Sequence, residues 1–269
     1  SSLPLFLGFG CNIPAVLGTR IIEDRRARLL TLLLAPLVPC TARLAVVAFL
    51  APAFFGELAT WVMVGLVALN LLVLVVVGVV LNRLAFRGAK TAFIMEMPLY
   101  HVPNVRTIGL FVWNNVWAFL KKAGSVIVVV AAIVWALSSW PGPGMEHSLL
   151  AGLGRALTPI GAWIGLDDWR FIVALLTSFV AKENTIATLG VLFSAGERGV
   201  GLARQVAAAL PPSAALAFLV VQMLFVPCVA TVAATKQEAG WRWALLGVLM
   251  LLALSLGAGT ITYQVFSRL

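Results

Sequence analysis

The sequence predicts an all-α, polytopic helical membrane protein with two broken-helix pseudo-repeats. The first observation is composition: 62% of the 269 residues are hydrophobic and only 11% are charged, and the mean hydropathy is +1.04. A soluble domain is roughly a quarter charged. The second is a series of charge-free runs long enough to cross a bilayer as helices and too long for barrel strands. The third is a Val-Pro-Cys element in each half.

The same composition narrows the function classes. It excludes a soluble enzyme, a disordered chain and a disulfide-rich secreted module, and three cysteines without a close pair do not predict a disulfide framework. The 19 basic residues outnumber the 10 acidic ones, but they cluster between apolar runs, as in cytoplasmic loops of membrane proteins. RNA-binding motifs, zinc-finger spacing and long basic tails are absent from the sequence, so no nucleic-acid partner is expected.

The charge-free runs predict about six or seven crossings, since each helix needs roughly 20 apolar residues. In chain order the runs are 1–19, 44–82, 123–145, 171–196, 205–235 and 243–267. The second run divides at Phe55-Gly56-Glu57, and Trp140-Pro141-Gly142 begins a stop after the third. Ser1 lies inside an apolar run without a preceding basic region, which predicts a fragment rather than a signal peptide.

Two segments break this simple pattern. Residues 29–42 are apolar but too short to span, and they contain Pro36 and Pro39, which remove backbone donors. Residues 205–235 are too long for one crossing and contain Pro227. Broken helices are tolerated at membrane depth only where they face protein or a wet cavity. The two segments therefore predict a substrate path.

The basic clusters predict the orientation of the chain. The positive-inside rule places residues 20–28 and 83–122 in the cytoplasm, whereas the topology beyond residue 205 stays open. Within 104–122, apolar residues recur at helical spacing, with tryptophans alongside. This pattern predicts an amphipathic helix at the cytoplasmic surface, and a plain loop is the alternative.

The two halves resemble each other over short stretches. Val38-Pro39-Cys40 recurs as Val226-Pro227-Cys228, and in residues 8–14 and 178–184 a Phe opens a polar break upstream. These similarities predict a two-fold repeat, with chance as the alternative. The expected parts of one transmembrane domain are a first repeat, a cytoplasmic loop with the amphipathic helix, and a second repeat, at 1–82, 83–122 and 123–269 respectively.

All three cysteines lie next to a helix break. Cys11 follows Gly10, and Cys40 and Cys228 follow prolines. A break frees backbone carbonyls and turns helix ends toward a cavity, and thiolate sulfur suits softer transition metals rather than sodium, magnesium or calcium. If the three segments converge, the thiols line a metal path. Three inert buried thiols are the alternative.

Lys182 and Glu183 are the only charges within 171–196. Charges at membrane depth are costly and face cavities with partners. We therefore expect Glu183 to offer a carboxylate to a cation, and Lys182 to neutralise it in the empty site. Asn12 and Asn184 would add amide oxygens in the two breaks. A loop at the membrane interface is the alternative.

Other candidate residues carry weaker signals. Met95, Glu96 and Met97 offer two thioethers and a carboxylate near the expected cytoplasmic face, where they could meet an exiting metal, although loop packing is the favoured interpretation. The sequence has no Gly-x-x-x-x-Gly-Lys-Ser/Thr, no Gly-x-Ser-x-Gly and no His-Glu-x-x-His. No enzyme activity is therefore expected of this chain.

Short motifs that cover most of the chain form a recognisable set. In order they are Gly8 to Ala15, Thr19-Arg20, Arg28 to Thr31, Ala35-Pro36, Met95 to Tyr100, Phe119 to Gly124, Phe179 to Glu183 and Val226 to Cys228. Together they resemble the membrane domain of the bacterial ferrous iron transport protein B family. Met97 stands where this family usually has Leu, and Asn184 stands where it commonly has a small apolar residue. Neither change removes a proposed ligand.

The resemblance implies a permease that takes up Fe(II) across the bacterial inner membrane. The Gly8 to Asn12 and Phe179 to Glu183 stretches would correspond to the family's two gate motifs, which resemble those of nucleoside-transporter-like folds. The gate residues would include Lys182 and Glu183 and the prolines. The resemblance carries a role in iron passage over to the three cysteines, and the chemistry of the residues adds two oxygen donors to the expected metal ligands. The gate prolines are Pro14, Pro39 and Pro227, and the ligands are Cys11, Cys40, Cys228, Glu183 and Asn12.

The family also implies partners outside this chain. Its members carry a GTPase domain, so GTP and magnesium would bind there and not here, and Fe(II) would be the transported substrate. The expected partners are membrane lipid, that domain, small cytosolic accessory proteins and a homo-oligomer. Two other functions stay open: a nucleoside-like solute carrier with inert cysteines, and a non-transporting anchor or sensor, against which the costly polar groups argue.

Overall fold

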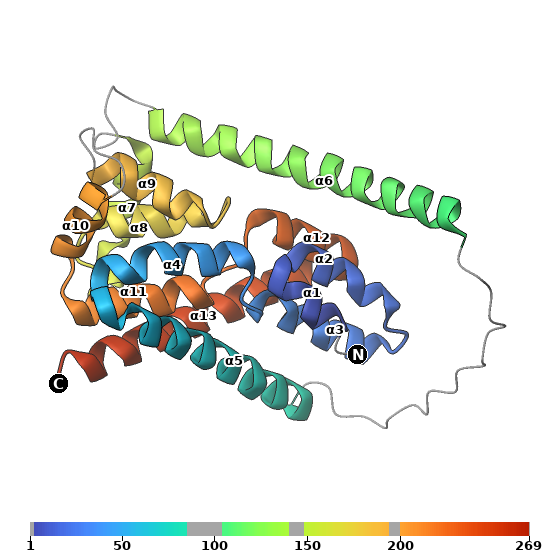
Figure 1. Cartoon of the computed structure of the whole chain (residues 1–269), viewed down its shortest axis with the longest axis horizontal. Coiled ribbons are helices and arrows are strands. Elements are labelled where there is room, and N and C mark those ends of the chain that lie inside the picture. Colours follow the sequence, from blue (N-terminus) through green and yellow to red (C-terminus); the bar gives the residue numbers. More distant parts are fainter. Residues whose placement is uncertain (1–2, 85–103, 140–147, 194–199, 269) are drawn as a thin grey trace.

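The computed structural model describes residues 3–84, 104–139, 148–193 and 200–268, and every regular element in these ranges is helical (Figure 1). The all-α prediction is therefore confirmed. The helices of the first half are α1 (Leu3–Gly10), α2 (Asn12–Gly18), α3 (Arg25–Leu34), α4 (Thr41–Phe55) and α5 (Ala59–Leu84). Those of the second half are α6 (Val105–Ser139), α7 (Leu149–Gly161), α8 (Trp169–Ser178), α9 (Asn184–Phe193), α10 (Val200–Ala209), α11 (Pro212–Leu224), α12 (Val229–Ala239) and α13 (Trp241–Phe266).

Short 3-10 turns continue several of these helices. They are η1 (Thr19–Ile21) after α2, η2 (Ala35–Leu37) after α3, η3 (Gly56–Leu58) after α4 and η5 (Ala162–Ile164) after α7. The side chains of Asp24 and Asp168 accept hydrogen bonds from the first amides of α3 and α8, as N-cap residues do. Helix α12 ends at Gly240, whose φ of 88° costs a glycine little.

The polar and proline breaks divide the apolar runs. By length and composition, three helical stretches of the described residues could cross a membrane: Arg25–Leu84, Pro212–Ala239 and Trp241–Phe266. A fourth would join Leu149–Ile164 to Trp169–Ser178, two pieces bent by 99°. This is fewer than the roughly six or seven crossings expected from run length. The runs 1–19 and 171–196 account for part of the difference, because each is cut at its polar break into short helices.

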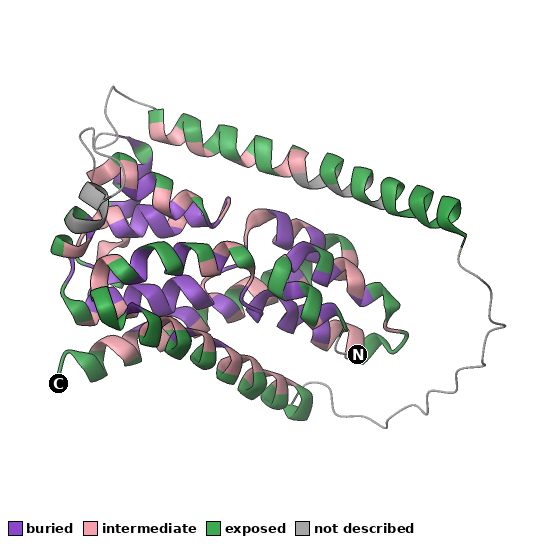
Figure 2. Cartoon of the chain, viewed as in Figure 1, coloured by how far each residue is buried: buried purple, intermediate pink, exposed green. Residues whose placement is uncertain are grey.

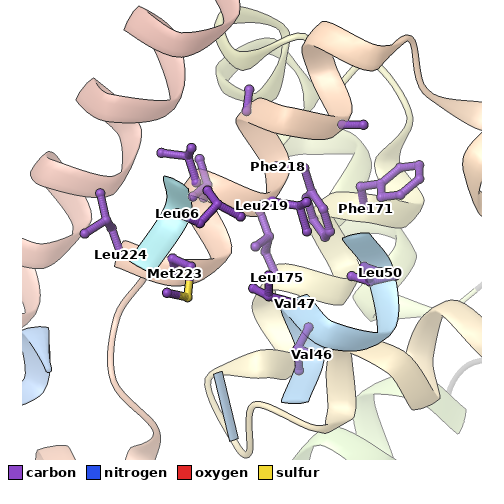
Figure 3. Packing of buried hydrophobic residues seen from close by; sticks show 14 of the residues in the cluster. Val46, Val47, Leu50, Leu66, Phe171, Leu175, Phe218, Leu219, Met223 and Leu224 are labelled. Atoms are coloured by element: carbon purple, nitrogen blue, oxygen red, sulfur yellow. The ribbon is translucent and has the colours of Figure 1, made fainter. Parts of the chain in front are cut away.

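Helix α11 is the centre of the core. All of its residues from Ala214 to Leu224 except Leu216 are buried (Figure 2), and α4, α5 and α13 pack around it. Phe218 of α11 meets Phe171 of α8 edge to face, with ring centroids 5.3 Å apart (Figure 3). Gly259 allows α13 to approach closely, since a Cβ there would lie 2.4 Å from Val221 Cγ2. This tightly packed scaffold supports the breaks described below.

Helix α6 is longer than the sequence suggests. It runs for 35 residues without interruption, about 52 Å at 1.5 Å per residue, and packs on α12 and α7 (Figure 1). The boundary expected at residue 122, between a cytoplasmic amphipathic helix and a following crossing, falls inside this helix. Its composition changes there, from tryptophans and lysines to a continuous apolar stretch, but helical propensity does not.

Candidate functional site

Four helix breaks meet around one cavity of about 240 Å³. The breaks precede α2, α4, α9 and α12, so the cavity lies between elements that are far apart in the sequence. A side chain of α6, Ile127, completes the wall. The remaining lining residues are 10–13, 40–43 and 180–183, with Pro227, Cys228, Ala230 and Thr231.

The three cysteines occupy equivalent positions at this cavity. Each is the N-cap of a helix: Cys11 of α2, Cys40 of α4 and Cys228 of α12. Their backbones are extended, with ψ of 136°, 161° and 153° respectively, and all three thiols are free and partly exposed. The structure thus brings together the three thiols that the sequence singled out. Their role as metal ligands stays a prediction.

The thiols do not form a preassembled metal cage. Within the described residues, no three side chains of Cys, His, Asp and Glu are grouped closely enough to hold one metal ion. The Cys228 thiol instead lies 3.2 Å from Thr231 Oγ1. A metal in this cavity would therefore not be bound by all three sulfur atoms at once. Tight binding by all three would need the helix breaks to move closer together.

A hydrogen bond from the residue after each Pro-Cys pair spans the cavity region in both halves. In the first half, Thr41 Oγ1 donates to the carbonyl of Gly10, 2.8 Å away. In the second half, the amide of Val229 donates to the carbonyl of Phe179, 2.7 Å away. Each donor is the residue directly after a Pro-Cys pair, and each acceptor lies in the upstream break of its own half. The two halves therefore close their breaks at corresponding positions, with a hydroxyl donor in the first half and an amide donor in the second.

Lys182 does not pair with Glu183. The lysine is buried at 3% exposure, and its Nζ donates to the carbonyl of Val226, 2.7 Å away, beside the ring of Phe225. Glu183 is exposed and forms no ion pair with it. The expected neutralisation of Glu183 by Lys182 is therefore absent. The physical reason is that the break before Pro227 leaves a carbonyl at depth, and Lys182 satisfies it.

A residue that the sequence analysis passed over lies beside the thiols. Arg43 is fully buried, and its Nη1 and Nη2 donate to the carbonyls of Pro36 and Phe225, at 2.9 and 2.6 Å. Its Nε has no partner in the structure. Arg43 was treated as the flank of the run beginning at residue 44. The sequence feature that could have identified Arg43 is its position, as a single charge three residues after Cys40 in an otherwise apolar region.

The remaining candidates divide between the cavity and other places. Asn12 is buried at the cavity wall, and in the orientation that satisfies its amide the nitrogen donates to the carbonyls of Gly8 and Ala35, both 3.2 Å away. Asn184, Pro14 and Pro39 are not among the lining residues, whereas Pro227 is. Met95, Glu96 and Met97 lie outside the described residues.

A closed ion-pair cluster lies at the far ends of α2 and α12. Glu238, in the last turn of α12, has a side chain only 3% exposed. It accepts hydrogen bonds from Arg20 Nε at 2.9 Å and from Arg28 Nη2 at 2.8 Å. These bonds raise the pKa of Arg20 above its usual value. The cluster ties the first half to the second, beyond the apolar contact that Val16 and Leu32 make with Ala230 and Ala234.

Comparison with known proteins agrees with this architecture. The family model described as ferrous iron transport protein B C terminus matches residues 63–115, and the gate model described as nucleoside recognition matches residues 120–242. No solved structure matches the chain.

Curated relatives cover most of the chain. An Fe(2+) transporter FeoB of Methanocaldococcus jannaschii is 35% identical over an alignment of 258 positions that covers 91% of this chain and 38% of that protein. An Fe(2+) transport protein A/Fe(2+) transporter FeoB fusion protein of Porphyromonas gingivalis is 30% identical over an alignment of 317 positions, gaps included, that covers 98% of this chain and 37% of that protein. An Fe(2+) transporter FeoB of Staphylococcus aureus is 32% identical over an alignment of 271 positions that covers 98% of this chain and 40% of that protein.

The chain thus spans about two fifths of the length of these relatives, at shares of 37% to 40%. The described helices agree with the character of a multi-pass membrane protein. Two family models and relatives over nearly the whole chain lead to one conclusion: the chain belongs to the ferrous iron transport protein B family, and it corresponds to the C-terminal part of the transmembrane region that contains the gate motif.

Proposed function

We propose that this chain is the permease part of a transporter that takes up Fe(II) across the bacterial inner membrane. One observation carries the proposal. Three free thiols, each at the start of a different helix, line a single cavity of about 240 Å³, in a chain whose relatives are named Fe(2+) transporters. Thiol sulfur is a good ligand for Fe(II) and a poor one for the hard cations that are more abundant in cells.

The cavity offers a mixed ligand set. Sulfur atoms of Cys11, Cys40 and Cys228 replace part of the hydration shell of Fe(II), and Asn12 and Glu183 supply oxygen atoms. Because the thiols are separated in the structure, two or three ligands engage at one time, which keeps binding loose enough for release. Thiols lose protons when they bind a metal, so affinity rises with pH.

Two matching halves provide the gating. The bonds from Thr41 to Gly10 and from Val229 to Phe179 support a division into a first gate repeat (1–82) and a second gate repeat (123–269). Transporters built from repeats alternate access by moving one repeat against the other around a fixed site. The segment 83–122 joins the two repeats on the cytoplasmic side.

The control of the path lies outside this chain. GTP and magnesium bind in a soluble GTPase domain, and hydrolysis there acts on the cytoplasmic segments 20–28 and 83–122. The fusion of an Fe(2+) transport protein A to a relative from Porphyromonas gingivalis supports a small accessory protein as partner. Met95, Glu96 and Met97 would meet the metal at the cytoplasmic exit.

The test is anaerobic Fe(II) flux into liposomes, with full-length protein that contains this segment. We expect the double variant Cys40→Ser/Cys228→Ser to lose at least about nine tenths of the flux, because each serine oxygen is a poor substitute for sulfur. The matched control is Ser138→Ala/Ser139→Ala, which removes two hydroxyls whose hydrogen bonds stay within α6. Normal insertion and melting temperature are required of both variants.

Each outcome separates the candidate functions. Unchanged iron flux in the cysteine variant would contradict the sulfur path and move the ligands to Glu183, Asn12 and backbone carbonyls. The second candidate, a nucleoside-like solute carrier, is favoured by the nucleoside-recognition description of the model over 120–242, and it predicts uptake of labelled nucleosides that is independent of the cysteines. An anchor or sensor predicts no flux of either substrate.

A further inference from the structure

Arg43 occupies a position that ordinary helix chemistry disfavours. It lies three residues after Cys40, the N-cap of α4, and so in the first turn of that helix. The N-terminal end of a helix carries a partial positive charge, which repels a cation. Arg43 is also 0% exposed, and it forms no ion pair with a carboxylate in the described part of the chain. A buried charge without a counter-charge is costly and needs another explanation.

The bonds of Arg43 supply that explanation. One prong of the guanidinium holds the carbonyl of Pro36, four residues before Cys40, and the other holds the carbonyl of Phe225, three residues before Cys228. Both carbonyls lead into a Val-Pro-Cys element. These elements have no regular helix geometry and start α4 and α12 without a side-chain cap. Local structure therefore does little to fix the Cys40 thiol, and at Cys228 it supplies one contact, that of the thiol with Thr231 Oγ1.

From this geometry we infer that Arg43 is a positioning residue, which sets the separation of the Cys40 and Cys228 thiols across the cavity. The guanidinium is planar and rigid, and its donors leave at fixed angles. Two carbonyls from different halves of the molecule are thereby held at a fixed spacing. Cys40 follows the first carbonyl by four residues and Cys228 follows the second by three, so the distance between the two thiols depends on the spacing of the carbonyls.

Lys182 does not duplicate this role. Its single ammonium group donates to one carbonyl, that of Val226, in the second half only. In the described part of the chain, Arg43 is the cavity side chain that hydrogen-bonds the backbone leading to the Val-Pro-Cys element in both halves. Lysine at position 43 would keep the charge and part of the volume but would lose the second fixed donor. Arg43→Lys therefore isolates the proposed property.

Two readouts test the inference in full-length protein that contains this segment, with cysteines elsewhere replaced. The first is the yield of a Cys40–Cys228 cross-link formed by dibromobimane in a Cys11→Ser background, which depends on thiol separation and not on metal. The second is anaerobic Co(II) binding, followed by the sulfur-to-cobalt charge-transfer band. The matched control is Arg242→Lys, an exposed arginine in the first turn of α13.

We expect Arg43→Lys to insert normally and to melt slightly below the wild type, because one buried carbonyl loses its donor. We expect it to lower the cross-link yield severalfold and to weaken Co(II) binding by roughly tenfold to a hundredfold, the usual effect of losing a group that orients metal ligands. Arg242→Lys should change neither readout. Wild-type yield and wild-type Co(II) affinity in folded Arg43→Lys would overturn the inference. If the lysine variant does not fold, Arg43→Gln makes the same comparison, and failure of both would make Arg43 a stability residue instead.

The metal readout rests on the proposed function, whereas the cross-link readout does not. If wild-type protein binds no Co(II) but cross-links in an Arg43-dependent manner, the proposed metal path fails and the positioning role stands. If Co(II) binds through sulfur equally well in both proteins and their cross-link yields are equal, the metal path stands and the positioning role fails.

Discussion

The charged side chains at the two ends of α12 have different kinds of partner. At its start, Arg43 and Lys182 donate to backbone carbonyls of the neighbouring break and have no carboxylate partner in the described structure. At its end, one buried carboxylate, Glu238, accepts from two arginines. Both ends join the first half of the molecule to the second. The difference indicates that the far end is a closed structural contact, whereas the cavity end keeps cationic groups beside an open space.

This contrast also bears on how a cation could use the cavity. Cys40 and Cys228 lie within electrostatic reach of both Arg43 and Lys182. A metal with two positive charges entering among these groups is repelled by Arg43 and Lys182, and thiolates formed from the thiols would add to the negative charge of Glu183 that offsets this repulsion. Ions that do not displace thiol protons gain only the oxygen ligands there. The cavity end would then select by chemistry as well as by size.

The largest effect is expected at the far end of α12. Glu238→Ala leaves Arg20 and Arg28 without their shared partner, and the free energy of unfolding should fall by about 2 kcal/mol, less than for a fully buried pair because Arg20 is 61% exposed. Denaturant titration in detergent measures the change. Glu57→Ala, an exposed carboxylate in η3, is the control. Equal stability of the two variants would remove the structural role of the far end.

A smaller effect on stability is expected at the cavity end. Lys182→Met leaves the Val226 carbonyl without its donor, a cost of about 1 kcal/mol, which loss of a buried charge partly offsets. Removing the positive charge should instead tighten Co(II) binding by about tenfold. Titration of Co(II) into the variant and the wild type checks this. An unchanged affinity would mean that Lys182 carries no charge in the empty cavity, and the contrast between the ends would lose its electrostatic basis.

The smallest effect separates the two arginines of the far end. Arg20→Gln should lower the free energy of unfolding by about 0.5 kcal/mol, because its side chain is largely exposed and its pairing is screened by salt. Arg28→Gln should cost more, since the Arg28 side chain is only 32% exposed. The same titration at low and high salt checks the order. Salt should reduce the effect of Arg20→Gln more than that of Arg28→Gln. A larger loss of stability in Arg20→Gln than in Arg28→Gln would contradict this prediction, because the stronger contact would then be the exposed one.

Much of the site could be predicted from sequence because its residues are unusual for their surroundings. Helix breaks are predicted where a cysteine follows glycine or proline, at three places, and where the Lys-Glu pair interrupts an apolar run. All four of these segments meet at the cavity. The helical class follows from composition in the same way. These patterns depend on neighbouring residues alone. A break that glycine or proline causes can therefore be predicted without knowledge of the residues that pack on it.

The parts that sequence did not predict depend on distant partners. Arg43 acts on Phe225, 182 residues away, and Arg20 on Glu238, 218 residues away. No periodicity or spacing reveals such pairs. The pairing of Lys182 with Glu183 was expected because they are neighbours, but an unsatisfied carbonyl of Val226 competes more strongly for the ammonium group. The continuity of α6 was missed because a change in polarity was taken for a helix end.

The length of α12 has a consequence for where the thiols lie in a bilayer. Ten residues separate Cys228 from Glu238, which is about 15 Å along a helix axis. The hydrocarbon core of a bilayer is about 30 Å thick. The charged cluster at Glu238, with Arg20 largely exposed, belongs at the headgroup level. If α12 runs along the membrane normal, Cys228 would lie near the midplane, where an ion has travelled half of its route and where lost hydration is hardest to replace.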